Sequence, residues 1–220
     1  MVDEELVPGG QLSGTARVEA FSDGVMAIAI TLLILEIKLP EYEPGHLLGA
    51  LGHIWPSYLA YLASFLTIGV IWMNHHAFFS RLRHVDHVVR WWNLMMLLGI
   101  SVLPFPTMVL AENAVHGHGN DAKVAAALYG IAGVIMTIPW APLWWRLVRR
   151  PELFEPRPGF DSAFARRESI RAYPGIVIYS ICIGVGLIQP VAALILYLVV
   201  AIFYGFTSQG WGTKQGDDSD

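Results

Sequence analysis

Six long apolar stretches follow one another along the 220-residue chain, separated by short polar connections. They cover residues 18–39, 52–79, 89–111, 122–146, 171–189 and 190–208. None of them shows the alternation of every second residue that is typical of membrane barrel strands. Backbone groups in lipid must be satisfied within their own segment, so stretches of this length predict transmembrane helices. The pattern therefore predicts an all-α fold, a bundle of six transmembrane helices, with a tight hairpin at Gln189-Pro190 between the last two.

The composition agrees with a membrane protein. Of all residues, 55% are hydrophobic and 15% charged, and the mean hydropathy is +0.50. Six crossings use most of the length, so we expect one domain, 17–208, between a cytoplasmic tail, 1–16, and a disordered cytoplasmic tail, 209–220. Cys182 is the only cysteine, which excludes an intrachain disulfide, and we expect it to be packed inside the fifth helix.

Arginines at the helix ends predict the orientation in the membrane. They gather in the connection between the second and third helices and in that between the fourth and fifth, at Arg81, Arg83, Arg90, Arg146, Arg149, Arg150, Arg157, Arg166, Arg167 and Arg171. The opposite connections hold only Lys38 and Lys123. Basic residues are retained on the cytoplasmic side, so both termini are expected there. Arginines beside apolar segments point to lipid as a partner and give no sign of nucleic acid.

The first helix carries charged residues at its cytoplasmic end. Arg17 and Asp23 are six residues apart and so lie on different faces of one helix, and buried ions in membranes need a partner. We therefore expect their partners on another helix or subunit. The second and third helices offer polar candidates at the same depth, namely Trp72, Asn74, His75, His76 and Asn93. This cluster either fixes the angle of a pore-lining helix or simply satisfies buried polar groups.

The remainder of the first helix has an apolar stripe. Ile28, Leu32 and Leu35 follow i, i+4, i+7 spacing on one face, with Thr31 beside them. Such stripes are usually packing surfaces. Around a shared axis, however, the same side chains would form rings that gate by dewetting, and Thr31 would offer hydroxyls to a passing cation.

Three segments resemble the transmembrane protein 175 family of potassium-permeable channels. RVEAFSDGVMAIAITLLILEI at 17–37 resembles that family's first helix, with its motif of Arg, three residues, then Phe-Ser-Asp. IWMNHHAFFSRL at 71–82 and NLMMLLGISVLPFPTMVL at 93–110 resemble its second and third helices. The three segments occur in order in the first half of the chain, whereas the last three helices fit only in number and length. Gly24 departs from the alanine that is frequent in the family.

The resemblance implies a homotetrameric potassium channel in a bacterial plasma membrane, with the first helix of each subunit lining a central pore. Ile28 would form the constriction, Leu32 and Leu35 further apolar layers, and Thr31 the hydroxyl layer linked to potassium preference. The motif residues would hold helices one to three together; they are Arg17, Phe21, Ser22, Asp23, Trp72, Asn74, His75, His76 and Asn93. Potassium would be the permeant ion, with modest preference over sodium, and no cofactor is expected.

Other signals leave alternatives open. A proton-coupled secondary transporter could use Asp23 with His75 or His76 as a relay. His84 and His87, and likewise His116 and His118, could bind a metal, although a solvated helix end and a loop are the simpler interpretations. Glycines in the fourth and fifth helices predict close helix approach, at Gly130, Gly133, Gly184 and Gly186. No HExxH, GxSxG, Walker or dinucleotide motif is present, so an enzyme is not expected.

Overall fold

The fold is a bundle of six long helical spans. We describe a computed structural model of residues 14–116, 119–155 and 162–207. The spans run over Thr15–Glu36, Trp55–Phe79, His87–Ala114, Asn120–Arg149, Ser162–Ile188 and Pro190–Thr207, and each is long and apolar enough to cross a membrane. The six predicted helices are thus confirmed in number and order. The parts of the predicted tails at 1–13 and 208–220, and the side chains of His116 and His118, lie outside the described residues.

Several spans are interrupted, so the six spans contain more than six helices. The helices are α1 (Thr15–Leu32), α2 (Leu47–His53), α3 (Trp55–Phe79), α4 (His87–Val102), α5 (Pro104–His116), α6 (Asn120–Thr137), α7 (Trp140–Arg149), α8 (Ser162–Arg171), α9 (Tyr173–Ile188) and α10 (Pro190–Thr207). Short 3₁₀ turns, η1 (Leu33–Glu36) and η2 (Pro151–Leu153), extend α1 and α7. Prolines at 104 and 139 mark two of the breaks because proline donates no backbone hydrogen bond. Gln189 alone separates α9 from α10, which confirms the predicted hairpin.

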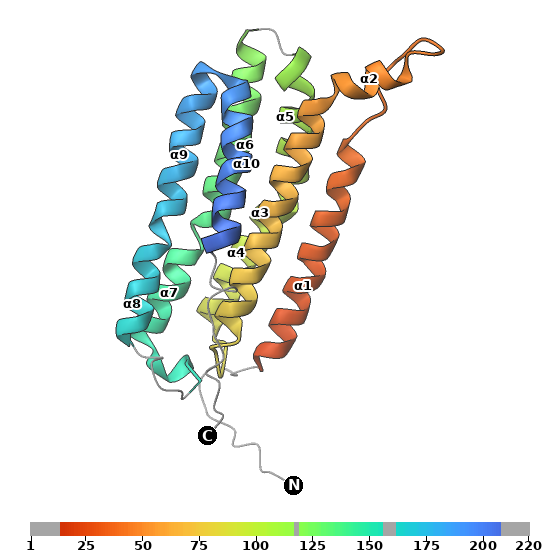
Figure 1. Ribbon diagram of the computed structural model, residues 1–220. Helices are drawn as coiled ribbons and strands as arrows, with labels where there is room; N and C mark the ends of the chain where they lie inside the picture. The colour runs from red at the N-terminus through yellow and green to blue at the C-terminus, as the bar shows by residue number, and fades with distance from the viewer. Residues whose placement is uncertain (1–13, 117–118, 156–161, 208–220) are drawn as a thin grey trace, which may run out of the picture.

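Two connections meet at one end of the bundle, which we call the arginine end. The α3–α4 and α7–α8 connections both lie there, at the same end as the start of α1 (Figure 1). They are joined by an antiparallel bridge between Leu82 and Phe154, in which the Arg83 N–H donates to the Leu153 carbonyl and the Glu155 N–H to the Arg81 carbonyl, both at 2.9 Å. The two polar connections are therefore held as one unit.

Small residues allow the closest packing in the bundle, between α6 and α9. A Cβ added at Gly133 would overlap the ring of Tyr179, and one added at Gly186 would lie 2.8 Å from the Ala126 Cβ. Gly130 similarly faces Ile183, so three of the four predicted close approaches are confirmed. Gly184 is a correction, because no heavy atom lies within 4 Å of the position where its Cβ would be. Cys182 is fully buried, as expected.

The first helix stands at the edge of the bundle. Figure 1 shows α1 on one side and α9 on the opposite side, with α3 and α10 between them. Helix α1 packs mainly on α3 and α4, whereas α6 contacts α4, α5, α9 and α10. This arrangement leaves one side of α1 without a neighbouring helix among the described residues.

Candidate functional site

Helix α1 has one packed face. Ser22, Met26, Ala29 and Leu33 recur at helical spacing and are all buried. The Met26, Ala29 and Leu33 side chains belong to the main hydrophobic core together with residues of α3, α4 and α5. The four positions follow i, i+4, i+7, i+11, so a single line along the helix faces the bundle.

The opposite face of α1 carries bulky apolar side chains that are exposed in the described part of the chain. Ile28 is 62% exposed, Leu32 42% and Leu35 69%. Phe21 and Thr31 are exposed on the same side of the helix. The subunit therefore does not use the predicted stripe for its own packing, which separates the two interpretations that the spacing alone left open.

The hydroxyl of Thr31 is oriented by its own helix. Its Oγ1 lies 3.0 Å from the Ala27 carbonyl oxygen and 2.9 Å from that of Ile28, so its single proton is donated to the backbone. A hydroxyl that donates its proton still has lone pairs that accept. On this exposed face, Thr31 can therefore present oxygen to a cation, one turn from Ile28.

A buried hydrogen-bond chain joins α1, α4 and α3. The Ser22 hydroxyl donates to the Val18 carbonyl at 2.8 Å, so its oxygen accepts from the Asn93 amide nitrogen at 2.9 Å. That assignment turns the Asn93 carbonyl oxygen toward His75, whose Nε2 must donate across 2.9 Å. His75 therefore carries a proton on Nε2, and its buried Nδ1 has no hydrogen-bond partner among the described residues.

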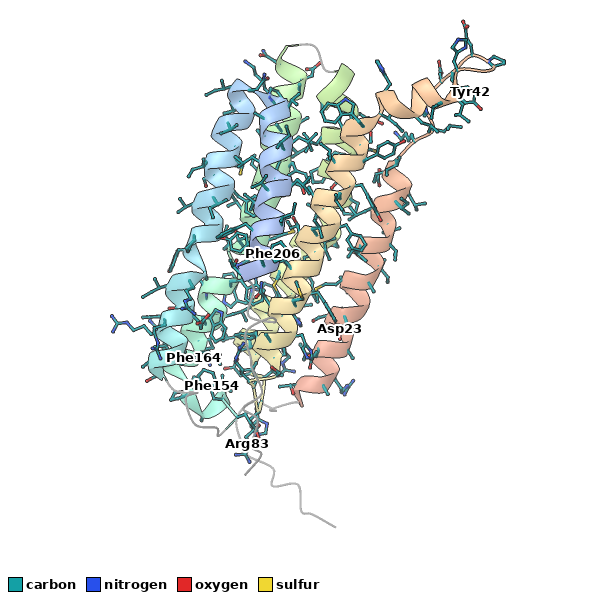
Figure 2. The ribbon with its side chains drawn as sticks, in the orientation of Figure 1. Asp23, Tyr42, Arg83, Phe154, Phe164 and Phe206 are labelled. Atoms are coloured by element: carbon teal, nitrogen blue, oxygen red, sulfur yellow. The ribbon has the colours of Figure 1, made fainter. Side chains whose placement is uncertain are left out.

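A second set of polar contacts joins α1 to α3 nearer the surface. Trp72 Nε1 donates to Asp23 Oδ1 at 3.0 Å, and His76 Nδ1 lies 2.7 Å from Glu19 Oε1. The rings of Trp72 and His76 also stack one turn apart. Asp23, labelled in Figure 2, thus has its partner on another helix, as expected for a carboxylate that the first helix cannot satisfy.

Three polar residues differ from the predicted cluster in place or role. Glu19 was not among the predicted site residues, although it lies within the motif segment and contacts His76 of α3 directly. Asn74 lies on another side of α3, where it lines a cavity with residues of α6 and α10. Arg17 is exposed on α1. A helical-wheel comparison of 71–76 places Asn74 away from Trp72 and His76, and that signal was available in the sequence.

The histidines near the arginine end do not gather around a metal. Within the described residues no group of three His, Cys, Asp or Glu side chains could hold one. Asp86, between His84 and His87, instead accepts from the Val89 N–H at the start of α4 and forms a 2.6 Å ion pair with Arg146 of α7. Burial alone would raise the pKa of Asp86, but the hydrogen bonds from Val89 and Arg146 lower it below its ordinary value.

Known proteins resemble this chain over nearly its whole length. The family described as endosomal/lysosomal potassium channel TMEM175 matches residues 17–104. A protein of Streptomyces collinus named a potassium channel is 43% identical over 205 residues, which are 93% of this chain and 98% of the relative. The chain belongs to the TMEM175 family. A Chamaesiphon minutus potassium channel is 36% identical over 92% of this chain and 99% of its own length.

A solved structure extends the TMEM175 likeness to three dimensions. The crystal structure described as a lysosomal potassium-selective channel TMEM175 homolog from Chamaesiphon minutus superimposes with a TM-score of 0.75 at 35% identity, and covers 89% of this chain and 98% of that chain. The chain is thus a multi-pass membrane protein of an ion-channel family, not of an enzyme family. The residues 17–104 matched by the family contain both the polar contacts and the exposed stripe of α1. Membership favours a channel over the proton-coupled transporter that remained open from the sequence.

Proposed function

We propose that this protein is the subunit of a potassium-selective channel that conducts passively through a pore lined by α1. The observation that carries the proposal is the exposed stripe of Ile28, Leu32 and Leu35 on a helix at the edge of the bundle. Four copies, arranged as a homotetramer around one axis, would bring these side chains together as stacked apolar rings. The name and structure of the relatives support potassium as the ion that passes.

The apolar rings would select by the cost of dehydration. A narrow hydrophobic constriction at Ile28 offers no oxygen to replace water, and such constrictions gate by dewetting. Potassium holds its hydration shell less tightly than sodium and would pass with the smaller barrier. The Thr31 oxygens, one turn away, would supply partial coordination, so the preference for potassium is expected to be modest.

The polar contacts would hold the pore helix at its base. The first turns of α1 are attached to α3 and α4 through Glu19, Ser22 and Asp23. The exposed stripe begins after them, at Ile28. A shift of this anchoring would tilt α1 and change the width at Ile28. The role that we assign to Glu19, Ser22 and Asp23 is therefore positional, whereas Phe21 lies on the same exposed side of α1 as the stripe.

The arginine end would face the cytoplasm of a cell with the channel in its plasma membrane. Arg81, Arg83 and Arg90 lie at or beside one connection at this end, and the arginines of α7 and α8 at the other. Retention of basic residues on the cytoplasmic side then also places the start of α1 inside. The end of the pore near Phe21, on the arginine side of Ile28, would then open to the cytoplasm.

Recording from the purified protein in a planar bilayer tests this proposal. We expect unitary current steps in symmetric KCl and, with KCl opposite NaCl, a reversal potential shifted toward the potassium equilibrium potential. Light scattering should give the mass of four 24.4 kDa subunits. Proton-coupled flux without unitary steps, or equal permeability to sodium and potassium, would contradict the proposal.

A further inference from the structure

A cavity of about 630 Å³ lies within the subunit between α3, α6, α9 and α10, toward the arginine end. Its existence follows from a difference in helix length. Gly205 of α10 packs beside Val70 of α3, and α10 ends at Thr207, whereas α3 continues to Phe79. Within the described part of the chain, which ends at Thr207, the last turns of α3, including Asn74, therefore extend past α10. Figure 1 shows α10 ending above the lower end of the bundle.

The cavity is apolar inside and has one unused polar atom. Buried residues form its inner wall, namely Thr67, Ile71, Gly133, Met136 and Tyr179. The Tyr204 hydroxyl is also buried, and it has no hydrogen-bond partner among the described residues.

The rim of the cavity is basic. Arg171 lines it and is 72% exposed while it pairs with Glu168 at 2.7 Å. Arg167 lies one turn earlier on the same face of α8 and is exposed, and it forms no ion pair within the described part of the chain. Glu168 also lines the cavity and neutralises Arg171, so these three side chains carry a net charge of +1, which Arg167 supplies beside the cavity. One positive charge at the edge of a mainly apolar cavity matches an amphiphile with an anionic head.

The mouth of the cavity lies on an exposed apolar surface of the kind that contacts lipid. Phe203 of α10 and Pro174 of α9 are exposed on its rim. Further bulky apolar residues of the same two helices are exposed, among them Val177, Ile181 and Val199. This flank is also on the side of the bundle away from α1 (Figure 1), so a molecule dissolved in the bilayer can enter between α9 and α10.

We propose that each subunit binds one anionic phospholipid at this cavity. One acyl chain occupies the mainly apolar interior, and the glycerol region lies at its mouth. The phosphate lies at the rim beside Arg167 and Arg171. A soluble anion would not need the apolar interior, and a neutral lipid would not use the basic rim, so the two features together select an anionic lipid.

Native mass spectrometry of the full-length channel, released from nanodiscs of phosphatidylglycerol and phosphatidylcholine in equal amounts, tests the headgroup. We expect one retained phosphatidylglycerol per subunit. The variants Arg167→Gln and Arg171→Gln should each weaken retention about fivefold. Arg83→Gln is the matched control, because it removes an exposed arginine at the same end of the bundle but away from the cavity (Figure 2), and it should retain lipid like the wild type.

Filling the cavity tests the acyl chain. Ala201→Phe places a ring in the interior and should abolish retention, whereas Ala192→Phe, on the exposed face of the same helix, should not. Equal retention of both lipids, or wild-type retention by the Arg167→Gln/Arg171→Gln double variant, would overturn the proposal, as would an Ala201→Phe protein that still holds phosphatidylglycerol. If Ala201→Phe does not fold, the exposed arginine variants decide.

Discussion

Helices α1 and α6 are both 18 residues long and mainly apolar, yet they are used in opposite ways. Helix α6 buries eight of its residues, most of them alanine or glycine, between α4, α5, α9 and α10. Helix α1 buries three and leaves bulky residues such as Ile28 exposed. Within a bilayer, hydrophobicity does not drive helices together, so the size of the side chains decides which face packs. Small residues thus mark the scaffold, and an unpartnered bulky stripe marks a free face.

The two helices are also attached differently. Helix α6 is held along its length by close approach, as at Gly133 against Tyr179. Helix α1 is held at its base by hydrogen bonds that Ser22, Asp23 and Glu19 accept from neighbouring helices. Substitutions on the two helices should therefore differ in how much stability they remove.

Gly133→Ala should be the most damaging change. Its Cβ would overlap the Tyr179 ring, which is itself buried against Tyr197, so the ring has little room to move. Overpacking of this kind costs about 1–3 kcal/mol and sometimes more. Thermal unfolding followed by tryptophan fluorescence should show a Tm lowered by roughly 2–4 °C for each kcal/mol, or the protein should not be recovered folded.

Gly184→Ala is the matched control on the partner helix. Its Cβ would meet open space, and alanine favours a helix over glycine by about 1 kcal/mol. Its Tm should be unchanged or slightly higher. A loss as large as that of Gly133→Ala would mean that close approach of α6 and α9 does not set the stability of the scaffold.

Asn93→Ala should come next, because it breaks the buried attachment of α1. The change leaves the His75 Nε2–H without an acceptor and the Ser22 oxygen without its donor, and an unsatisfied buried group costs about 1–3 kcal/mol. The same unfolding assay should report the loss. Asn74→Ala is the matched control, because it truncates an asparagine of α3 that makes no hydrogen bond among the described residues. It should lower the Tm much less. Equal losses would contradict an anchoring role for Asn93.

Acid should weaken the attachment of the α3–α4 connection to α7. The pKa of Asp86 is below its ordinary value of 3.8 because Val89 and Arg146 stabilise the carboxylate against the opposing effect of burial. The stabilisation is therefore complete above about pH 4 and is lost as the pH falls through the folded pKa. We expect Asp86→Asn to lower stability by about 1 kcal/mol at pH 7 and to flatten the fall of Tm between pH 5 and pH 3.

Glu152→Gln provides the comparison for this pH effect. Glu152 pairs with Arg150 at 3.0 Å, but both side chains are more than half exposed, so solvent screens the pair. Its pH profile should follow that of the wild type. A wild-type profile for Asp86→Asn as well would show that the acid sensitivity arises elsewhere.

Much of the scaffold could be predicted because its signals are local. Six apolar stretches gave the six spans, Gln189-Pro190 the hairpin, and Gly130, Gly133 and Gly186 the close approach to neighbouring helices. Asp23 could be assigned a partner on another helix because an ion in an apolar span needs one. The polar helix α8 was missed, since its arginines resemble a loop in a hydropathy scan although they flank a buried Ala165.

The residues that could not be predicted are those whose role depends on which neighbour their helix face points toward. Gly184 and Gly186 are two residues apart, and only the second faces α6, which composition cannot indicate. Asn74 and His75 are adjacent but lie on different sides of α3, so one lines the cavity and the other bonds Asn93. Glu19 was overlooked because an acidic residue near a helix start is ordinarily a solvated one. Unlike the missed helix α8, these three errors concern the rotation of a helix about its axis.

Ile28→Asn should change stability least and function most. Ile28 is 62% exposed and is not part of the buried core, so the free energy of unfolding should change by less than about 0.5 kcal/mol. If four copies of this side chain close the pore, the amide would let water into the constriction, and unitary conductance should rise severalfold with weaker preference for potassium. Ile181→Asn makes the same change at a 56% exposed position on α9, across the bundle from α1, and should leave conductance unaltered. Conductance that responds to both variants or to neither would place the constriction away from Ile28, because only a residue at a shared axis can act on the current while contributing nothing to the fold.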